Sequence, residues 1–112
     1  MAKQPGSERR QHKRIQVASS LVKQSDFNAI DLSESGIQVS SSRKFRVGET
    51  IKLELNLKTE DNSLSLDCRV MWCRPSQSVF TTDNLIGLRF IDINASNTLR
   101  LRRYIEYLQE TQ

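Results

Sequence analysis

The chain has 112 residues, of which 37% are hydrophobic and 27% charged, and it has no apolar stretch near the ~20 residues that span a bilayer. A chain of this length buries roughly two thirds of its unfolded surface as one domain. These values predict a single soluble domain that does not bind membranes, and they exclude large enzymes.

The positive charge is concentrated near the N-terminus. Residues 1–14 carry five basic and one acidic side chain, whereas residues 15–112 carry twelve of each. The net charge of +4 therefore belongs to a leader without hydrophobic periodicity. Two interpretations stay open for it, a solvated disordered end or an arm that binds an anion. We expect residues 1–7 to be a flexible tail and residues 8–112 to form the domain, including the arginine leader.

The two cysteines, Cys68 and Cys73, are too few to stabilise a secreted disulfide scaffold. The first residues also lack the apolar core of a signal peptide. Both features predict a cytoplasmic protein. Because the cysteines are five residues apart in one predicted strand, their side chains are expected on opposite faces.

Alternating hydrophobicity and turn residues predict several short strands. Their approximate ranges are 15–22, 27–32, 37–39, 51–57, 64–72 and 85–91. In the fifth of these, the alternation places Leu66, Cys68, Val70 and Trp72 on the inner face. Gly87 interrupts the last strand, which indicates a bulge or a close backbone approach.

The last twenty residues change to helical periodicity. Asp92 and Asn94 are suitable N-cap residues, and Leu101, Ile105 and Leu108 form an apolar stripe with Tyr104 beside it. The predicted fold class is all-β (mainly β): a six-stranded antiparallel β-barrel with a C-terminal α-helix packed on it.

Residues for catalysis or metal binding are scarce. The only histidine, His12, has no cysteine or carboxylate at metal-ligand or triad spacing, and no phosphate-binding glycine loop occurs. We therefore expect no metal site and no enzymatic activity. Trp72 and Phe90 fall in apolar alternation, so we expect both in the core and not on a stacking surface.

Two polar motifs stand out from this background. The first is Glu8-Arg9-Arg10-Gln11-His12-Lys13-Arg14, in which Arg10 and Arg14 are four residues apart. The second is Asp31-Leu32-Ser33-Glu34-Ser35-Gly36, at the end of a predicted strand. Without further context, the second motif also fits a β-turn with an Asx cap.

Together the motifs resemble the RxxxR and [DN]xSxxG motifs of the PilZ-domain family, bacterial receptors for the second messenger cyclic di-GMP. Arg10 and Arg14 match the first motif, and Asp31, Ser33 and Gly36 match the second. The resemblance covers nearly the whole chain from about Glu8, and it implies the same six-stranded barrel with a helix over one side.

The resemblance implies a non-enzymatic receptor without a cofactor, which binds cyclic di-GMP through Arg9, Arg10, Arg14, Asp31, Ser33 and Gly36. Ligand binding would bring the N-terminal arm onto the barrel, and an unidentified downstream protein would read the changed surface. Two alternatives stay open: a basic-armed barrel that binds single-stranded nucleic acid, or a PilZ-like protein–protein adaptor. A neutral body with 6% aromatic residues disfavours a nucleic-acid polymer.

Overall fold

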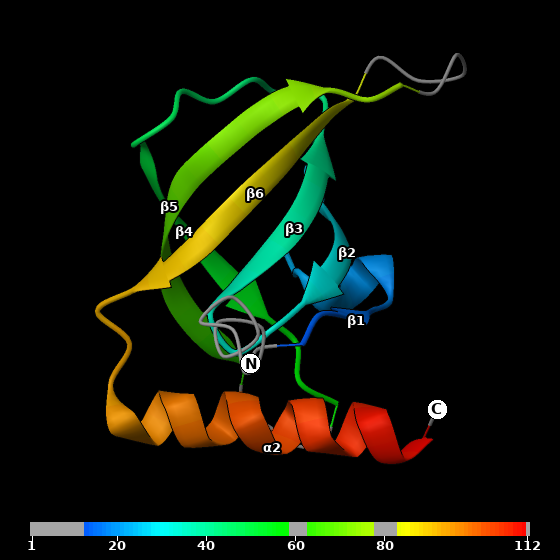
Figure 1. Cartoon of the computed structure of the whole chain (residues 1–112), viewed down its shortest axis with the longest axis vertical. Coiled ribbons are helices and arrows are strands. Elements are labelled where there is room, and N and C mark those ends of the chain that lie inside the picture. Colours follow the sequence, from blue (N-terminus) through cyan, green and yellow to red (C-terminus); the bar gives the residue numbers. More distant parts are fainter. Residues whose placement is uncertain (1–12, 59–62, 78–82, 112) are drawn as a thin grey trace, which may run out of the picture.

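The structure, a computed structural model, describes residues 13–58, 63–77 and 83–111 (Figure 1). Its elements are β1 (Ile15–Gln16), β2 (Asn28–Leu32), β3 (Gly36–Ser41), β4 (Thr50–Leu55), β5 (Leu64–Pro75), β6 (Asn84–Ile91) and α2 (Ala95–Thr111), with a 3-10 turn at Ser19–Leu21. The predicted fold class, six antiparallel strands and one C-terminal helix, is confirmed.

The six strands form one curved sheet in the order β1-β2-β3-β6-β5-β4. Its two edges approach each other where the chain after β1 reaches β4. There Val22 bridges Leu55, the Lys23 amide donates to the Glu54 carbonyl at 2.8 Å, and the Asn56 amide donates to the Leu21 carbonyl at 2.7 Å. The sheet is therefore barrel-like, and its outermost strands are joined by these few bonds without a continuous ladder.

The core lies inside the curve of the sheet and follows the predicted alternation. Leu53 and Leu55 of β4 are fully buried, and so is Leu57, two residues after the strand ends. The inner face of β5 contributes Leu64, Leu66, Cys68 and Val70, which are all buried. Each such leucine contributes roughly 1.5–3 kcal/mol through burial, so the core holds the sheet in its curved form.

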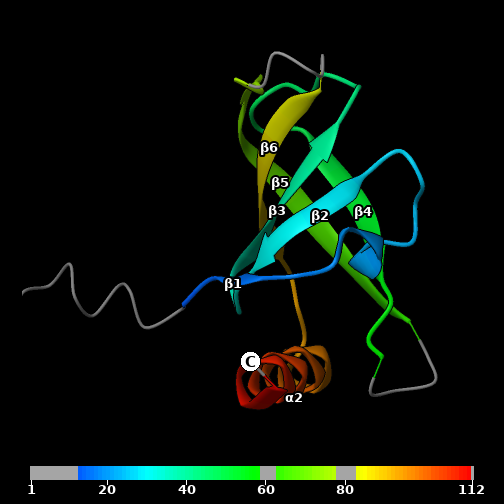
Figure 2. The same cartoon turned by 90° about the vertical axis from the view of Figure 1, so that its right-hand side faces the viewer.

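Helix α2 lies across one end of the sheet, as both views show (Figures 1 and 2). The Asn94 side chain caps its first turn by accepting a hydrogen bond from the Asn97 amide at 2.7 Å. Leu101, Tyr104 and Ile105 are buried, and the partly buried Leu108 packs against the core. The predicted cap at Asn94 and the predicted apolar stripe are both confirmed.

Two sequence predictions about β5 are wrong for one reason. The register with β6 shifts between Val70 and Trp72, so Met71 and Trp72 both face outward. One extra residue in a strand moves every later side chain to the other face. Trp72 is consequently 37% exposed, although the alternation placed it in the core. Cys73 packs against the core on the same side as Cys68, although the spacing placed the two on opposite faces.

Candidate functional site

The turn between β2 and β3 is organised by the hydroxyl of Ser33. This oxygen accepts hydrogen bonds from the amides of Ser35 and Gly36, each at 3.2 Å, while the Ser33 amide donates to the Gly36 carbonyl at 2.9 Å. Ser33 is fully buried. Its hydroxyl therefore stabilises a tight turn, as serine commonly does in such motifs.

Gly36 begins β3 directly beside β6. A Cβ atom at this position would clash with the backbone oxygen of Leu88. The glycine is therefore required for the close approach of the β3 and β6 backbones.

Arg14 and Asp31 are in direct contact, although they are seventeen positions apart. The Arg14 Nε donates to Asp31 Oδ1 at 2.6 Å, and the two side chains are 46% and 19% exposed. The pairing of β1 with β2 produces this contact, because Ile15 lies opposite Leu32 and places Arg14 beside the end of β2. The pair leaves other guanidinium nitrogens of Arg14 available for a ligand.

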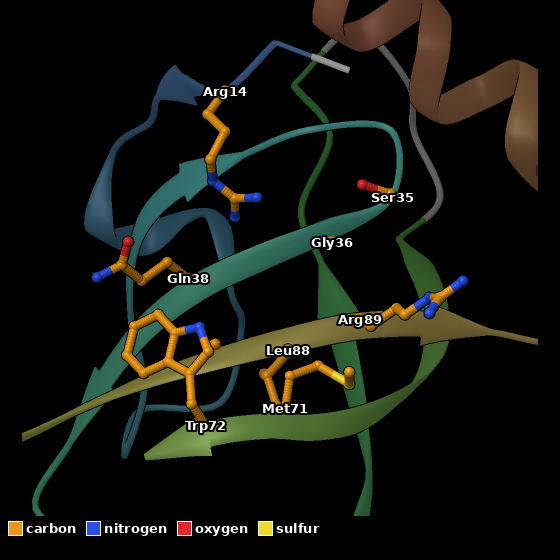
Figure 3. A pocket seen from close by; sticks show the side chains of 9 residues that line it. Arg14, Ser35, Gly36, Gln38, Met71, Trp72, Leu88 and Arg89 are labelled. Carbon is orange, nitrogen blue, oxygen red and sulfur yellow. The ribbon is translucent and has the colours of Figure 1, made fainter. Parts of the chain in front are cut away.

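An open pocket of about 550 Å³ lies next to this pair (Figure 3). It extends from Arg14 and the β2–β3 turn to the outer face of β5 and β6. Its lining residues are Arg14, Ser35, Gly36, Gln38, Met71, Trp72, Gly87, Leu88 and Arg89. The pocket thus combines two guanidinium groups, turn polar groups and an indole ring.

Sequence reasoning missed several pocket residues, among them Gln38, Met71, Arg89 and Trp72, and Trp72 is the only one that it had assigned to the core. Its indole ring fills the space that a Cβ at Gly87 would occupy, and the Arg74 guanidinium lies 4.9 Å from the ring centroid. The glycine within the last predicted strand indicated a close approach, but it did not reveal which group approaches. The missing information was the bulge that turns Trp72 outward.

The structure brings together four of the six predicted site residues. Arg14, Asp31, Ser33 and Gly36 lie within one turn and its neighbouring strand end, whereas Arg9 and Arg10 lie outside the described residues. The same turn also contacts α2, because Arg102 Nε donates to Glu34 Oε1 at 3.3 Å. The β2–β3 turn is thus linked to both the N-terminal segment and the C-terminal helix.

Other chemistry is sparse in the described part of the chain. It contains no group of three potential metal-ligating side chains, and none of its helices is long and apolar enough to cross a membrane. Burial, with a smaller contribution from Asp67, raises the pKa of the Cys68 thiol to about 12. A neutral thiol in the core is a packing group and not a nucleophile.

Comparison with known proteins identifies the family and the fold. A PilZ-domain family model matches residues 8–107. The PilZ domain with c-di-GMP of YcgR from Escherichia coli superposes with a TM-score of 0.68 at 18% identity, covering 92% of this chain and 93% of that one. YcgR of Escherichia coli in complex with c-di-GMP gives a TM-score of 0.67 at 18% identity, covering 92% of this chain and 47% of the longer one.

A search of curated protein sequences finds no match. At 18% identity, the two structural similarities establish the shared fold. The family model spans both polar motifs, the sheet and most of α2. This chain belongs to the PilZ-domain family.

Proposed function

We propose that this protein is a receptor for cyclic di-GMP. The observation that supports the proposal most strongly is the Arg14–Asp31 pair, held at 2.6 Å beside a Ser33-ordered turn and at the rim of a pocket. In this proposal the ligand contacts Arg9, Arg10, Arg14 and Asp31, while Ser33 and Gly36 shape the turn that receives it. Two solved structures with the same fold, both of YcgR from Escherichia coli, contain c-di-GMP.

The chemistry of arginine fits this ligand. Cyclic di-GMP carries two phosphates and two guanines, and a guanidinium group forms bidentate hydrogen bonds with phosphate oxygens or with the O6/N7 edge of guanine. Asp31 orients the Arg14 guanidinium through its Nε and leaves its terminal nitrogens for the ligand. Lysine at position 14 would supply the charge without this planar geometry.

Trp72 and the neighbouring backbone of β6 extend the proposed site. The indole is 37% exposed at the pocket, and Gly87 and Leu88 line the same cavity. Stacking of a guanine base on an aromatic ring is worth about 1–3 kcal/mol, and at Trp72 the base takes the place of the Arg74 guanidinium that lies 4.9 Å from the ring centroid. We assign this role to Trp72.

The proposed output is a change in the N-terminal arm. A ligand held by Arg9 and Arg10 as well as by the β2–β3 turn draws the residues from Glu8 up to Arg14, which already pairs with Asp31, onto the sheet, at roughly 1–2 kcal/mol of entropy for each residue that becomes fixed. A downstream protein then reads the new surface. Hydrogen exchange tests this step: amides from Glu8 to Ile15 gain protection with saturating cyclic di-GMP, and unchanged protection despite measured binding contradicts it.

We propose that the receptor acts without catalysis or a cofactor, and in the cytoplasm. Cys68 and Cys73 are not joined in a disulfide, which is the usual state of cysteines in cytoplasmic proteins. A neutral body disfavours nucleic acid as the main ligand, since polymer binding depends on several cationic phosphate contacts.

Calorimetry of the whole chain tests the receptor function. Cyclic di-GMP is titrated into the wild type, with GTP and a short single-stranded RNA as controls. The proposal is supported if cyclic di-GMP gives a saturable binding isotherm while GTP and the RNA give none. Arg10→Ala and Arg14→Ala each weaken binding about ten- to a hundredfold, because each removes charge-assisted hydrogen bonds. A double variant that binds like the wild type, or a wild type that prefers RNA, overturns the assignment.

A further inference from the structure

Two arginines on the outer face of the sheet lie directly opposite each other. Arg69 of β5 is paired in register with Arg89 of β6, and both are exposed. Side chains at such positions have their Cβ atoms about 4.5–5.5 Å apart, and like charges there destabilise the sheet. Within the described residues, neither guanidinium has a hydrogen-bond or ion-pair partner.

Neither of the nearest carboxylates forms an ion pair with the two arginines. Asp67, two residues before Arg69, pairs with Lys52 at 3.1 Å. Asp92 lines the same cavity as the two arginines but forms no ion pair with either. Two arginines without an ion-pair partner in one cavity form a suitable binding site for an anion, because both guanidinium groups can donate hydrogen bonds to its oxygens.

The cavity beside this pair adjoins the proposed ligand site. It has a volume of about 410 Å³, and it shares Met71 and Arg89 with the pocket at Arg14. Figure 3 shows the Arg89 side chain directed away from Trp72. Arg89 therefore stands between two cavities, one with Arg14 and Trp72 and the other with Arg69.

The register of the sheet places these cations in one row. Gly36 of β3 lies opposite Arg89, and Arg89 lies opposite Arg69. Adjacent strands are about 4.8 Å apart, so the row crosses three strands within roughly 10 Å. Arg14 approaches the row from the β2–β3 turn, and Gly36 contributes no side chain between it and Arg89. At this row β3 thus contributes only a glycine, whereas Gln38, two residues along the strand, lines the pocket beside it.

We propose that Arg69 and Arg89 form a second phosphate subsite, which binds a phosphodiester group beyond the one held at Arg14. The inference rests on the proposed receptor function and adds to it the position of a second anion. The phosphodiester belongs either to the cyclic di-GMP already bound at Arg14 or to a second molecule. Both sources present the same singly charged group to the arginine pair.

Charge-removing variants with a matched control test the subsite. Arg69→Gln and Arg89→Gln remove one charge each from exposed positions, and Arg103→Gln removes the same charge from the exposed surface of α2. Cyclic di-GMP is titrated calorimetrically into each full-length variant. We expect at least about fivefold weaker binding for either subsite variant and unchanged binding for Arg103→Gln.

The stoichiometry distinguishes the two sources. A fall from two molecules bound to one assigns the subsite to a second nucleotide, and an unchanged ratio with weaker affinity assigns it to the second phosphate of the same nucleotide. Thermal melting without ligand shows whether a subsite variant is still folded. Because Arg69→Gln and Arg89→Gln each remove a contact between like charges, we expect a melting temperature equal to or above that of the wild type.

Three results overturn the inference. Wild-type affinity and stoichiometry in both subsite variants exclude the subsite, while weakening by Arg10→Ala and Arg14→Ala in the same assay keeps the receptor function intact. An equal loss in Arg103→Gln means that total charge, and not this pair, governs binding. A wild type without affinity for cyclic di-GMP excludes the receptor function and the subsite together.

Discussion

The indole ring of Trp72 occupies the space where a side chain at Gly87 would begin. The β5 bulge turns the tryptophan outward, and the glycine opposite it gives the ring room to lie against the sheet. The contact places the only tryptophan of the chain in the proposed ligand pocket. Trp72 is therefore also an intrinsic fluorescent probe of that site.

Gly87→Ala is expected to displace the indole from the sheet. The tryptophan is partly exposed and can rotate, so the variant folds, its emission shifts to the red, and its affinity for cyclic di-GMP falls. Gly36→Ala is the contrasting variant, because its Cβ meets the Leu88 backbone oxygen, which cannot rotate away. It costs about 1–3 kcal/mol of stability. An unshifted emission spectrum in Gly87→Ala contradicts the close contact.

Ser33→Ala is expected to act through the turn. The change removes the acceptor of two amide hydrogen bonds in a buried position, which costs about 1–3 kcal/mol in the free energy of unfolding. Urea denaturation without ligand measures the loss, with Ser65→Ala at an exposed position of β5 as the control. If Ser33→Ala keeps wild-type stability while ligand affinity falls, Ser33 is a direct ligand contact instead.

Variants at Asp31 separate specific recognition from general charge attraction. Asp31→Ala removes a negative charge near a dianionic ligand, so electrostatics alone predicts tighter binding. Our account predicts weaker binding, because Arg14 loses the carboxylate that orients its guanidinium. Asp31→Asn keeps an oxygen for Arg14 Nε and is expected to bind more tightly than Asp31→Ala. Affinity for cyclic di-GMP that rises in Asp31→Ala opposes the specific site.

The buried Cys68 thiol predicts a loss of stability at alkaline pH. Burial raises its pKa from 9.0 to about 12, so between these values the native state retains a proton that the unfolded state releases. The stabilisation is complete below about pH 9, and stability falls above it by up to about 1.4 kcal/mol for each pH unit. Urea denaturation at pH 8 and pH 10 measures this slope.

Cys68→Val provides the reference for that experiment. It removes the thiol and retains a buried apolar side chain, while Tyr104, whose pKa is also raised by burial, is present in both proteins. The variant is expected to lose less stability than the wild type between the two pH values. Equal losses would mean that the thiol does not contribute.

Local patterns predicted much of the fold and part of the candidate site. Alternation in β4 and helical spacing in α2 are direct consequences of which face is buried, so Leu53 and Leu101 were identifiable from the sequence. The turn at Ser33 was identifiable as well, because serine and glycine have strong turn chemistry.

The features that the sequence did not predict, the bulge in β5 and the register between β5 and β6, depend on interactions between distant segments. One inserted residue in β5 reversed the faces of Trp72 and Cys73, and no local pattern marks the exact position of such a bulge. The opposition of Arg69 and Arg89 likewise follows from the register between β5 and β6, which the sequence alone does not specify. Both features contribute to the surface beside the motif turn.

Mapping cyclic di-GMP onto the folded chain by NMR tests the central claim most directly. Isotope-labelled wild type is titrated while backbone amide and indole signals are followed. We predict saturable shifts at the amides of Ser35, Gly36 and Gly87 and at the Trp72 indole, with none at Lys44 and Val47, which line a separate cavity. Saturable shifts centred on Lys44 and Val47, or no saturable shift at the Arg14 pocket, would contradict the account.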